Sequence, residues 1–416
     1  MRESRSSDLL FGLGRIQEKD SVPTEKRGSG DNMIATISLF TTTLSPAAGG
    51  LAASIPPLAH RLARSGAAEV HVVGLEDPDD PAAARAWGPM VHAHQSRGPS
   101  ALAYAPQMAQ TLERLAPDVI DVQGLWTYPS LVNLRHHHRY STPYIVTPRG
   151  MLDPWARMRS RWKKRAVQLW FEDEHLARAA CLRATAEMEA EHFRAMGLRN
   201  PIAIVPNGVD VPDELPSRST AERRRVLFLS RIHPKKGLPY LLRAWARLEP
   251  SYPDWDLIIA GPDEVGHTAD MKRLSQNLKL RNVQFQAAVY GAHKSAMYRS
   301  ADVFVLPTHA ENFGLVIAEA LAHEVPVITT RHAPWQGLRG HRCGWWIDLD
   351  EDQLFTALSE AMAQPRTELN AMGARGRAWM QRDFSWDHVA ESMLEVYDAI
   401  AHQKPLPEHL RYDSPT

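Results

Sequence analysis

The sequence has 416 residues, of which 44% are apolar and 23% are charged. Because this length exceeds what one hydrophobic core usually serves, we expect two domains of ordinary globular composition. Lys plus Arg and Asp plus Glu each number 48, which gives a formal net charge of zero. A neutral chain has no overall field that attracts nucleic acid, so the composition argues against a general DNA or RNA binder.

Cysteine usage and hydropathy indicate the compartment. Cys181 and Cys343 are far apart and at no metal-ligand spacing, so we expect neither a disulfide framework nor a zinc site. The sequence contains no apolar run near the roughly 18 residues that span a bilayer, and residues 1–32 have no apolar core of the secretion type. We therefore expect a cytoplasmic protein in which residues 1–32 are a disordered N-terminal extension or reflect an upstream translation start.

From Met33 onward, short apolar runs alternate with longer stretches of helical periodicity, as in parallel sheets covered by crossover helices. A segment dense in turn-forming residues, 206–216, interrupts this alternation once. The pattern predicts an α/β protein with two similar doubly wound domains that face each other. The predicted strands are 34–40, 70–75, 119–122, 144–147, 181–184 and 202–205 before the interruption, and 226–229, 257–260, 283–285, 303–306 and 325–329 after it.

The predicted boundaries follow from this alternation. A first Rossmann-like domain spans 33–210, a linker spans 211–224, and a second Rossmann-like domain spans 225–385. The remaining segment, 386–416, contains a helix that follows a closed second sheet, and we expect it to cross back to the first domain before a short tail.

The strongest chemical signal is the pair Glu311 and Glu319, which follows the predicted strand 303–306. If a helix begins near Phe313, eight residues at about 100° each bring both acids to one face and into one cleft. Gly314 lets a ligand approach the backbone, and free amides at a helix start can hold a phosphate. Paired carboxylates suit the vicinal hydroxyls of a sugar or ribose. The alternative is a solvated helix face.

A basic loop follows the first predicted strand of the second half. Arg231, Lys235 and Lys236 precede Gly237, after which we expect a helix to begin. Cations at the carboxyl end of a parallel strand lie where open α/β sheets bind phosphates. We therefore predict that Arg231 and Lys236 neutralise a diphosphate, the alternative being ordinary exposed charge.

A glycine pair follows the first predicted strand of the first half. Gly49 and Gly50 precede the helix that covers the sheet. Without side chains, they permit close contact between the backbone and a substrate, although a simple tight turn explains them equally well.

These motifs together resemble family 4 glycosyltransferases from about residue 33 to about residue 400, and most of all bacterial members that assemble exopolysaccharide, lipopolysaccharide or capsule. The resemblance implies the GT-B fold, in which two Rossmann-like domains face each other across a cleft. The stretches that carry it are 49–50, 148–155, 206–210, 230–231 with 236–237, 260–263, 311–319, 333–335, 343–346 and 384–386.

The resemblance also implies roles for single residues. Arg231 and Lys236 resemble the diphosphate anchors, Glu319 the acid that holds the ribose hydroxyls, and Glu311 the acid that faces the donor sugar. The second domain is then expected to bind the nucleotide sugar mainly, and the first domain the acceptor. The donor-binding residues implied in this way are Gly49, Gly50, Asp263, Asn312, Phe313, Gly314, Leu315 and Glu319.

The family's mechanism is front-face substitution with retention of configuration, in which the leaving diphosphate helps to deprotonate the incoming hydroxyl. The resemblance therefore implies no side-chain nucleophile, no cofactor and no metal, with the nucleotide diphosphate sugar as co-substrate. The acceptor is expected to be a saccharide or a lipid-linked saccharide.

Two positions depart from the family pattern. Many relatives carry a histidine near the transferred sugar where this chain has Arg149, a cation that cannot act as a base. We place Arg149 with the catalytic residues, a purely structural arginine being the alternative. Relatives also often show His-x-His-Gly where this chain has residues 121–124, Asp-Val-Gln-Gly.

A basic and aromatic segment lies in the first half. Such a segment can lie on an anionic membrane surface and so serve a lipid-linked acceptor at the inner face of the membrane. A solvated helix with a buried apolar stripe is an equal alternative. Its members are Trp155, Arg157, Arg159, Arg161, Trp162, Lys163, Lys164, Arg165, Trp170 and Phe171.

Three consecutive histidines, His136, His137 and His138, point in different directions on a helix and have no carboxylate at ligand spacing, so we interpret them as a polar helix end rather than a metal site. Two other function classes stay open. One is a GT-B sugar nucleotide epimerase or phosphorylase, and the other is a sugar-binding or scaffold protein without catalysis.

Overall fold

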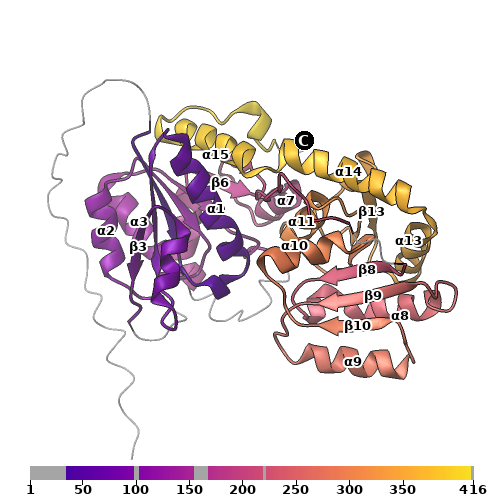
Figure 1. Ribbon diagram of the computed structural model, residues 1–416. Helices are drawn as coiled ribbons and strands as arrows, with labels where there is room; N and C mark the ends of the chain where they lie inside the picture. The colour runs from indigo at the N-terminus through magenta and orange to yellow at the C-terminus, as the bar shows by residue number, and fades with distance from the viewer. Residues whose placement is uncertain (1–33, 98–102, 154–166, 219–221, 414–416) are drawn as a thin grey trace, which may run out of the picture. The chain divides into compact units, whose positions relative to one another are not determined.

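The computed structural model describes residues 34–97, 103–153, 167–218 and 222–413. They form two sheets whose neighbouring strands all run parallel, in the orders β3-β2-β1-β4-β5-β6-β7 and β10-β9-β8-β11-β12-β13 (Figure 1). Each order reverses direction once, between β1 and β4 and between β8 and β11, so the predicted doubly wound α/β class is confirmed.

The strand bounds are β1 Thr36–Thr41, β2 Glu69–Leu75, β3 Met90–His94, β4 Val119–Gln123, β5 Tyr144–Thr147, β6 Cys181–Ala184, β7 Ile202–Ile204, β8 Arg224–Leu229, β9 Trp255–Ala260, β10 Val283–Gln286, β11 Val303–Leu306, β12 Val327–Thr330 and β13 Gly344–Ile347. Every predicted strand is present, with ends within two residues of the prediction. β3 and β13, an edge strand of each sheet, were missed.

The helix bounds are α1 Gly50–Ser65, α2 Gln107–Leu115, α3 Tyr128–Tyr140, α6 Asp173–Arg178, α7 Glu187–Ala195, α8 Leu238–Leu248, α9 His267–Asn277, α10 Gly291–Arg299, α11 Leu315–Ala322, α12 Gly337–Gly340, α13 Glu351–Ala363, α14 Arg366–Asp383 and α15 Trp386–Ala401. A π-helix, η4, spans Gln168–Glu172 and precedes α6. Among the described residues, no helix has both the length and the apolar content needed to cross a membrane.

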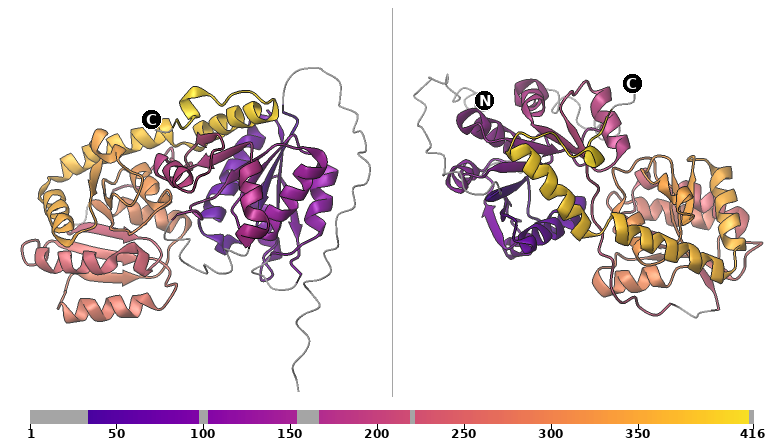
Figure 2. Two further views of the ribbon diagram at one scale, coloured as in Figure 1. Left: turned by 180° about the vertical axis from the view of Figure 1, so that it is seen from behind. Right: turned by 90° about the horizontal axis from the view of Figure 1, so that it is seen from above.

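The last long helix, α15, belongs to the core of the first half. It packs along α1, as Figures 1 and 2 show, and its apolar residues share one buried cluster with β1 and β2. The Tyr397 hydroxyl donates a hydrogen bond of 2.8 Å to the buried carboxylate of Asp121 in β4. The chain therefore passes twice between the halves, and the two passages pair where the Val209 amide donates to the Phe384 carbonyl at 2.8 Å.

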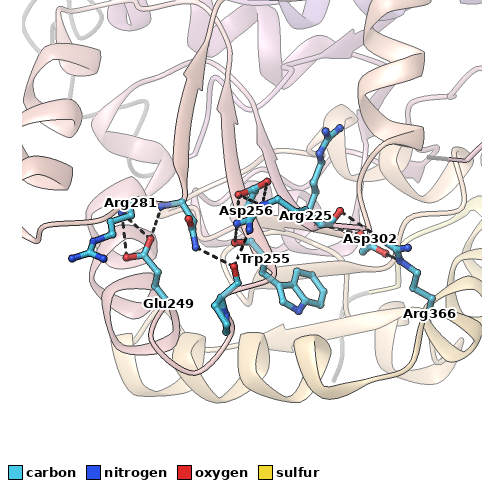
Figure 3. Close-up of polar contacts among 10 residues, drawn as sticks. Arg225, Glu249, Trp255, Asp256, Arg281, Asp302 and Arg366 are labelled. Carbon is cyan, nitrogen blue, oxygen red and sulfur yellow. Dashed lines mark hydrogen bonds and ion pairs between the residues drawn. The ribbon is translucent and has the colours of Figure 1, made fainter. Parts of the chain in front are cut away.

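A network of charged side chains connects the amino-terminal ends of the strands of the second sheet (Figure 3). Asp302, directly before β11, accepts hydrogen bonds from the backbone amide of Arg225 at 2.9 Å and from Nε of Arg366 at 3.1 Å. Asp256 in β9 accepts two from Nε of Arg223 at 3.0 Å. Because the strands are parallel, their amino-terminal ends all lie on the side of the sheet opposite the carboxyl ends, which carry the predicted site.

Two predictions fall outside the described residues. These are the N-terminal extension, 1–32, and the part of the basic and aromatic segment that spans 155–165.

Candidate functional site

A cleft of about 570 Å³ is lined by residues of both halves. It opens at the carboxyl ends of the strands, beside the points where the two strand orders reverse, which is where open α/β sheets bind ligands. All predicted site residues except Asp263 line it: Gly49, Gly50, Arg149, Arg231, Lys236, Glu311, Asn312, Phe313, Gly314, Leu315 and Glu319.

Lys236 and Glu311 form an ion pair in this cleft. Their side chains are only 7% and 12% exposed. Lys236 ends a short 3-10 helix after β8, and Glu311 lies in the loop after β11. Because both side chains are shielded from bulk water, their electrostatic interactions with a bound ligand are stronger than at the surface. The pair therefore offers a fixed cation for phosphate beside a carboxylate that accepts hydroxyl hydrogen bonds.

Gly237 brings these two loops together. It has a φ of 69°, and a Cβ atom there would lie 1.8 Å from the carbonyl oxygen of Pro307, which follows β11. Only glycine fits such a contact with a left-handed backbone. The Lys236 loop can therefore lie directly against the segment that leads to Glu311.

Glu319, on α11, is held by two side chains of α10. Its Oε1 lies 2.5 Å from Nζ of Lys294, and its Oε2 accepts a 2.7 Å hydrogen bond from the Tyr298 hydroxyl. Burial, and then the charge of Glu319, raise the pKa of Tyr298, which keeps its hydroxyl a donor. The sequence analysis missed Lys294 and Tyr298, which share a helix face at a spacing of four residues.

The start of α11 differs from the prediction. The helix begins at Leu315, so Glu311 precedes it, and the expectation that both acids share one helix face was wrong. The Glu311 amide instead donates to the His332 carbonyl at 2.9 Å, and the Trp335 indole donates to the Phe313 carbonyl at 2.5 Å. These contacts position the loop. The N-cap residue of α11 is Gly314, which has no side chain to cap the helix, so the amides at its start lie where a phosphate can accept from them.

Arg149 lies directly beyond β5 with a left-handed φ of 55°, which is rare for a residue with a side chain. Its Nε donates to Oε1 of Gln123 at 2.8 Å, and its Nη1 donates to Oδ1 of Asn207. Burial, and then the nearby charge of Arg183, lower the pKa of Arg149 to about 9. It is still a cation at neutral pH. Gln123, one of the departures from the family pattern, therefore orients this cation.

Arg231 and Asp263 differ from the rest of the predicted set. The Arg231 side chain is 56% exposed and pairs with Glu264 at 2.6 Å. Asp263 is absent from the cleft lining. Its carboxylate accepts backbone hydrogen bonds from Val265 at 3.3 Å, from His267 at 2.9 Å and from Thr268 at 3.3 Å, and so caps the start of α9.

Gly49 and Gly50 form the start of α1, with Gly49 at a φ of 59°. A Cβ atom at either position would meet no atom within 4 Å, so space in the cleft is open in front of both. No group of three or more His, Cys, Asp or Glu side chains in the described parts of the chain is arranged to hold a metal ion.

Comparison with known proteins identifies the two halves. The description "Glycosyl transferase 4-like domain" matches residues 49–208, and "Glycosyl transferases group 1" matches residues 214–379. The chain is 32% identical over 258 residues to a D-inositol 3-phosphate glycosyltransferase of Actinosynnema mirum, covering 54% of this chain and 59% of that protein. It is 30% identical over 224 residues to a phosphatidyl-myo-inositol mannosyltransferase of Mycobacterium tuberculosis, covering 51% and 58%. The matches thus span somewhat more than half of the length of these relatives.

Among solved structures, HepE of Anabaena in complex with UDP superimposes with a TM-score of 0.72 at 18% identity, over 88% of this chain and all of that one. At this identity the likeness establishes the fold, which is GT-B as the sequence analysis expected. The two matched domains occur in order and together cover most of the sequence. The chain belongs to the glycosyltransferases that join a 4-like domain to a group 1 domain in the GT-B fold.

Proposed function

We propose that this protein transfers a sugar from a nucleotide diphosphate sugar to a hydroxyl of a saccharide or lipid-linked acceptor in the synthesis of cell-surface glycans, with retention of configuration. The observation that carries the proposal is the convergence of Lys236, Glu311 and Glu319 on one cleft. A pyrophosphate with a sugar at each end needs a cation at its centre and hydroxyl acceptors on both sides.

In the proposed reaction, the bond between the anomeric carbon and the phosphate oxygen breaks while the acceptor oxygen bonds to that carbon on the same face. The hydroxyl proton passes to the departing diphosphate. Lys236, Arg231 and the amides at the start of α11 stabilise the charge that develops on the leaving group. Glu311 accepts from hydroxyls of the transferred sugar, and Glu319 accepts from the ribose.

Arg231 and Lys236 both line the cleft, where they can face the phosphates directly, which supports a reaction that needs no metal. The prediction of no cofactor therefore stays part of the proposal. Transfer should persist in excess EDTA. A complete loss that Mg²⁺ restores would contradict this part of it.

The acceptor is proposed to bind the first half, near Arg149. The names of the two relatives include inositol 3-phosphate and phosphatidyl-myo-inositol, which supports an acceptor hydroxyl on a polyol or sugar. Purified protein incubated with UDP-, GDP- and ADP-sugars and with lipid or saccharide acceptors should release the nucleoside diphosphate only when an acceptor is present. Rearrangement of the sugar nucleotide without acceptor would indicate an epimerase instead.

Peripheral contact with an anionic membrane is a further part of the proposal. Leu169 and Trp170 of η4 are 74% and 59% exposed and follow the cationic residues of 157–165 in sequence. Exposed apolar side chains beside cations suit a lipid surface. The protein should float with anionic liposomes at low salt, and Leu169→Ser with Trp170→Ser should abolish flotation. Flotation of this variant to the same extent would remove the two residues from the proposal.

A further inference from the structure

One residue of the loop that carries Glu311 reaches across to the first half. We call residues 311–314 the donor loop. The side-chain amide of Asn312 in this loop donates a 2.9 Å hydrogen bond to Oγ1 of Thr185, which follows β6. Thr185 is only 2% exposed, so its hydroxyl is held by the first half before it meets the donor loop.

The hydroxyl of Thr185 has its direction fixed by Glu189. It lies 2.8 Å from Oε2 of Glu189, which also accepts the Thr185 backbone amide at 2.8 Å. An ionised carboxylate only accepts, so the single hydroxyl hydrogen is directed to Glu189. The lone pairs of the hydroxyl are then left to accept from Asn312. In this contact between the halves, Asn312 must therefore donate and Thr185 must accept.

Gly150 completes the binding surface for Asn312. The Gly150 backbone amide donates to Oε1 of Glu189 at 2.8 Å, so the Glu189 carboxylate binds both Gly150 and Thr185. Gly150 has a φ of 74°, and a Cβ atom there would lie 2.8 Å from Cβ of Asn312. Any side chain at this position would push Asn312 away. Gly150 also follows Arg149 directly, so the same surface connects the donor loop to that cation.

We propose that Gly150, Thr185 and Glu189 form a seat that docks Asn312 and thereby sets the position of the donor loop against the acceptor-binding half. The inference rests on the proposed function. Thr185 and Glu189 are positioning residues, because they hold Asn312 and through it the neighbouring Glu311. Transfer requires the acceptor oxygen and the anomeric carbon, bound by different halves, to be held in attacking geometry, and a 1 Å error costs about 100-fold in rate.

The test uses the full-length protein and a matched set of variants. Thr185→Val keeps the shape but removes the hydroxyl, and Thr185→Ser keeps the hydroxyl. Gln336→Ala is the control, because Gln336 makes another hydrogen bond between the halves, 3.4 Å to Glu187 at an exposed position outside the cleft. Asn312→Asp is a second variant from the other side of the contact, since a carboxylate has no hydrogen to donate to Thr185 and lies near Glu189.

We expect Thr185→Val to lower kcat for transfer by about 10- to 100-fold, while the dissociation constant of the nucleoside diphosphate, measured by calorimetry, stays within about twofold because the proposed nucleotide contacts lie in the second half. Thr185→Ser and Gln336→Ala should match the parent protein. A merely structural role of Thr185 would instead lower the melting temperature and change both constants together.

The radius of gyration from small-angle X-ray scattering gives a readout that needs no activity. Thr185→Val and Asn312→Asp should both increase it relative to the parent, and Thr185→Ser should not. Equal radii and equal kcat in the parent and in both seat-breaking variants would overturn the seat. If the parent protein transfers no sugar from any donor, the proposed function fails, and the scattering comparison alone still decides whether the seat holds the halves together.

Discussion

At the scale of single residues, the ion pair of Lys236 and Glu311 gives the most direct test of the proposed mechanism. We expect Lys236→Met to lower kcat by about 100- to 1000-fold, the usual loss when one group that stabilises transition-state charge is removed. It also leaves a carboxylate that is 12% exposed without its cation. Radiometric transfer assays and urea unfolding of the same samples separate the two effects.

The double variant Lys236→Met with Glu311→Gln is the matched comparison. It removes both charges, so stability should recover while activity stays lost. Lys272→Ala, on α9 and outside the cleft lining, serves as a charge control. Near-normal turnover in the single variant would remove Lys236 from the mechanism.

The cysteines provide a second prediction at this scale. Cys181 and Cys343 are fully buried, and burial raises the pKa of each thiol to about 12. The thiolate is the reactive form, so neither thiol should react with a disulfide reagent in the folded protein at pH 7.5. Both should react once denaturant is added. Fast labelling of either thiol in the native protein would show that the region around it opens locally.

The sequence singled out residues that lie together in the structure where a motif combines charge with strand position. Lys236, Glu311 and Glu319 line one cleft, although Glu311 precedes α11 and shares no helix face with Glu319. Lys294 and Tyr298 were missed because their role depends on α10 lying beside α11, which no local pattern encodes. Asp263 shows the reverse case, since the residue type suits a ligand but its carboxylate is used to cap α9.

At the scale of elements, strands were predicted from apolar runs, and the two that were missed have only short runs, Met-Val in β3 and Trp-Trp-Ile in β13. β3 contains His92 and His94 and has no fully buried residue, and β13 begins with Gly344 and is half-buried. Edge strands have a neighbour on one side only, so their sequences need less apolar surface. The central strands, which position the cleft, are buried along most of their length and were therefore the easiest to recognise.

The network at the amino ends of the second sheet leads to a prediction about elements. Asp302→Ala removes the acceptor for the Arg225 amide and for Arg366, which are 2.9 and 3.1 Å away. Because Asp302 is 7% exposed, losing these bonds should lower the free energy of unfolding by about 1–3 kcal/mol. The cleft lies at the opposite edge of the sheet, so kcat should not change.

Asp352→Ala is the control for this variant, because the Asp352 side chain is 81% exposed in its pair with Arg247 and such pairs contribute little. Urea unfolding followed by fluorescence measures all three proteins. A fall in kcat for Asp302→Ala at a temperature where the variant is fully folded would show that the amino-terminal ends of the strands are coupled to the cleft at their carboxyl ends.

At the scale of the whole molecule, the two-sheet architecture followed from one feature, the alternation of apolar runs with helical periodicity on both sides of a turn-rich segment. For α15, the sequence analysis expected a return to the first half because the helix follows a closed second sheet. The fold shows which residues meet there, since Trp386 and Met393 join the buried core of the first half. Likewise, the contact of Asn312 with Thr185 joins residues 127 positions apart, and no local sequence pattern around either residue predicts the contact.

Stability of the whole molecule should fall in mild acid, because burial lowers the pKa of several histidines, namely His92, His94, His136, His309 and His323. For His136, burial outweighs the attraction of Glu113 and acts with the repulsion of His137 and Arg139 to bring the pKa from 6.5 to about 4. The unfolded state then binds more protons between these values, so stability rises with pH across this window and is lost as pH falls through it.

The contribution of His136 alone should be about 2 kcal/mol between pH 7.5 and pH 5, from the size of the shift. Thermal unfolding at both pH values measures it. In His136→Gln, which keeps a polar side chain without the titrating ring, the difference in melting temperature between pH 7.5 and pH 5 should shrink. An undiminished difference would mean that the other histidines, or carboxylates titrating in the same range, govern the acid response, and single glutamine substitutions at His94 and His323 would then show which buried ring carries it.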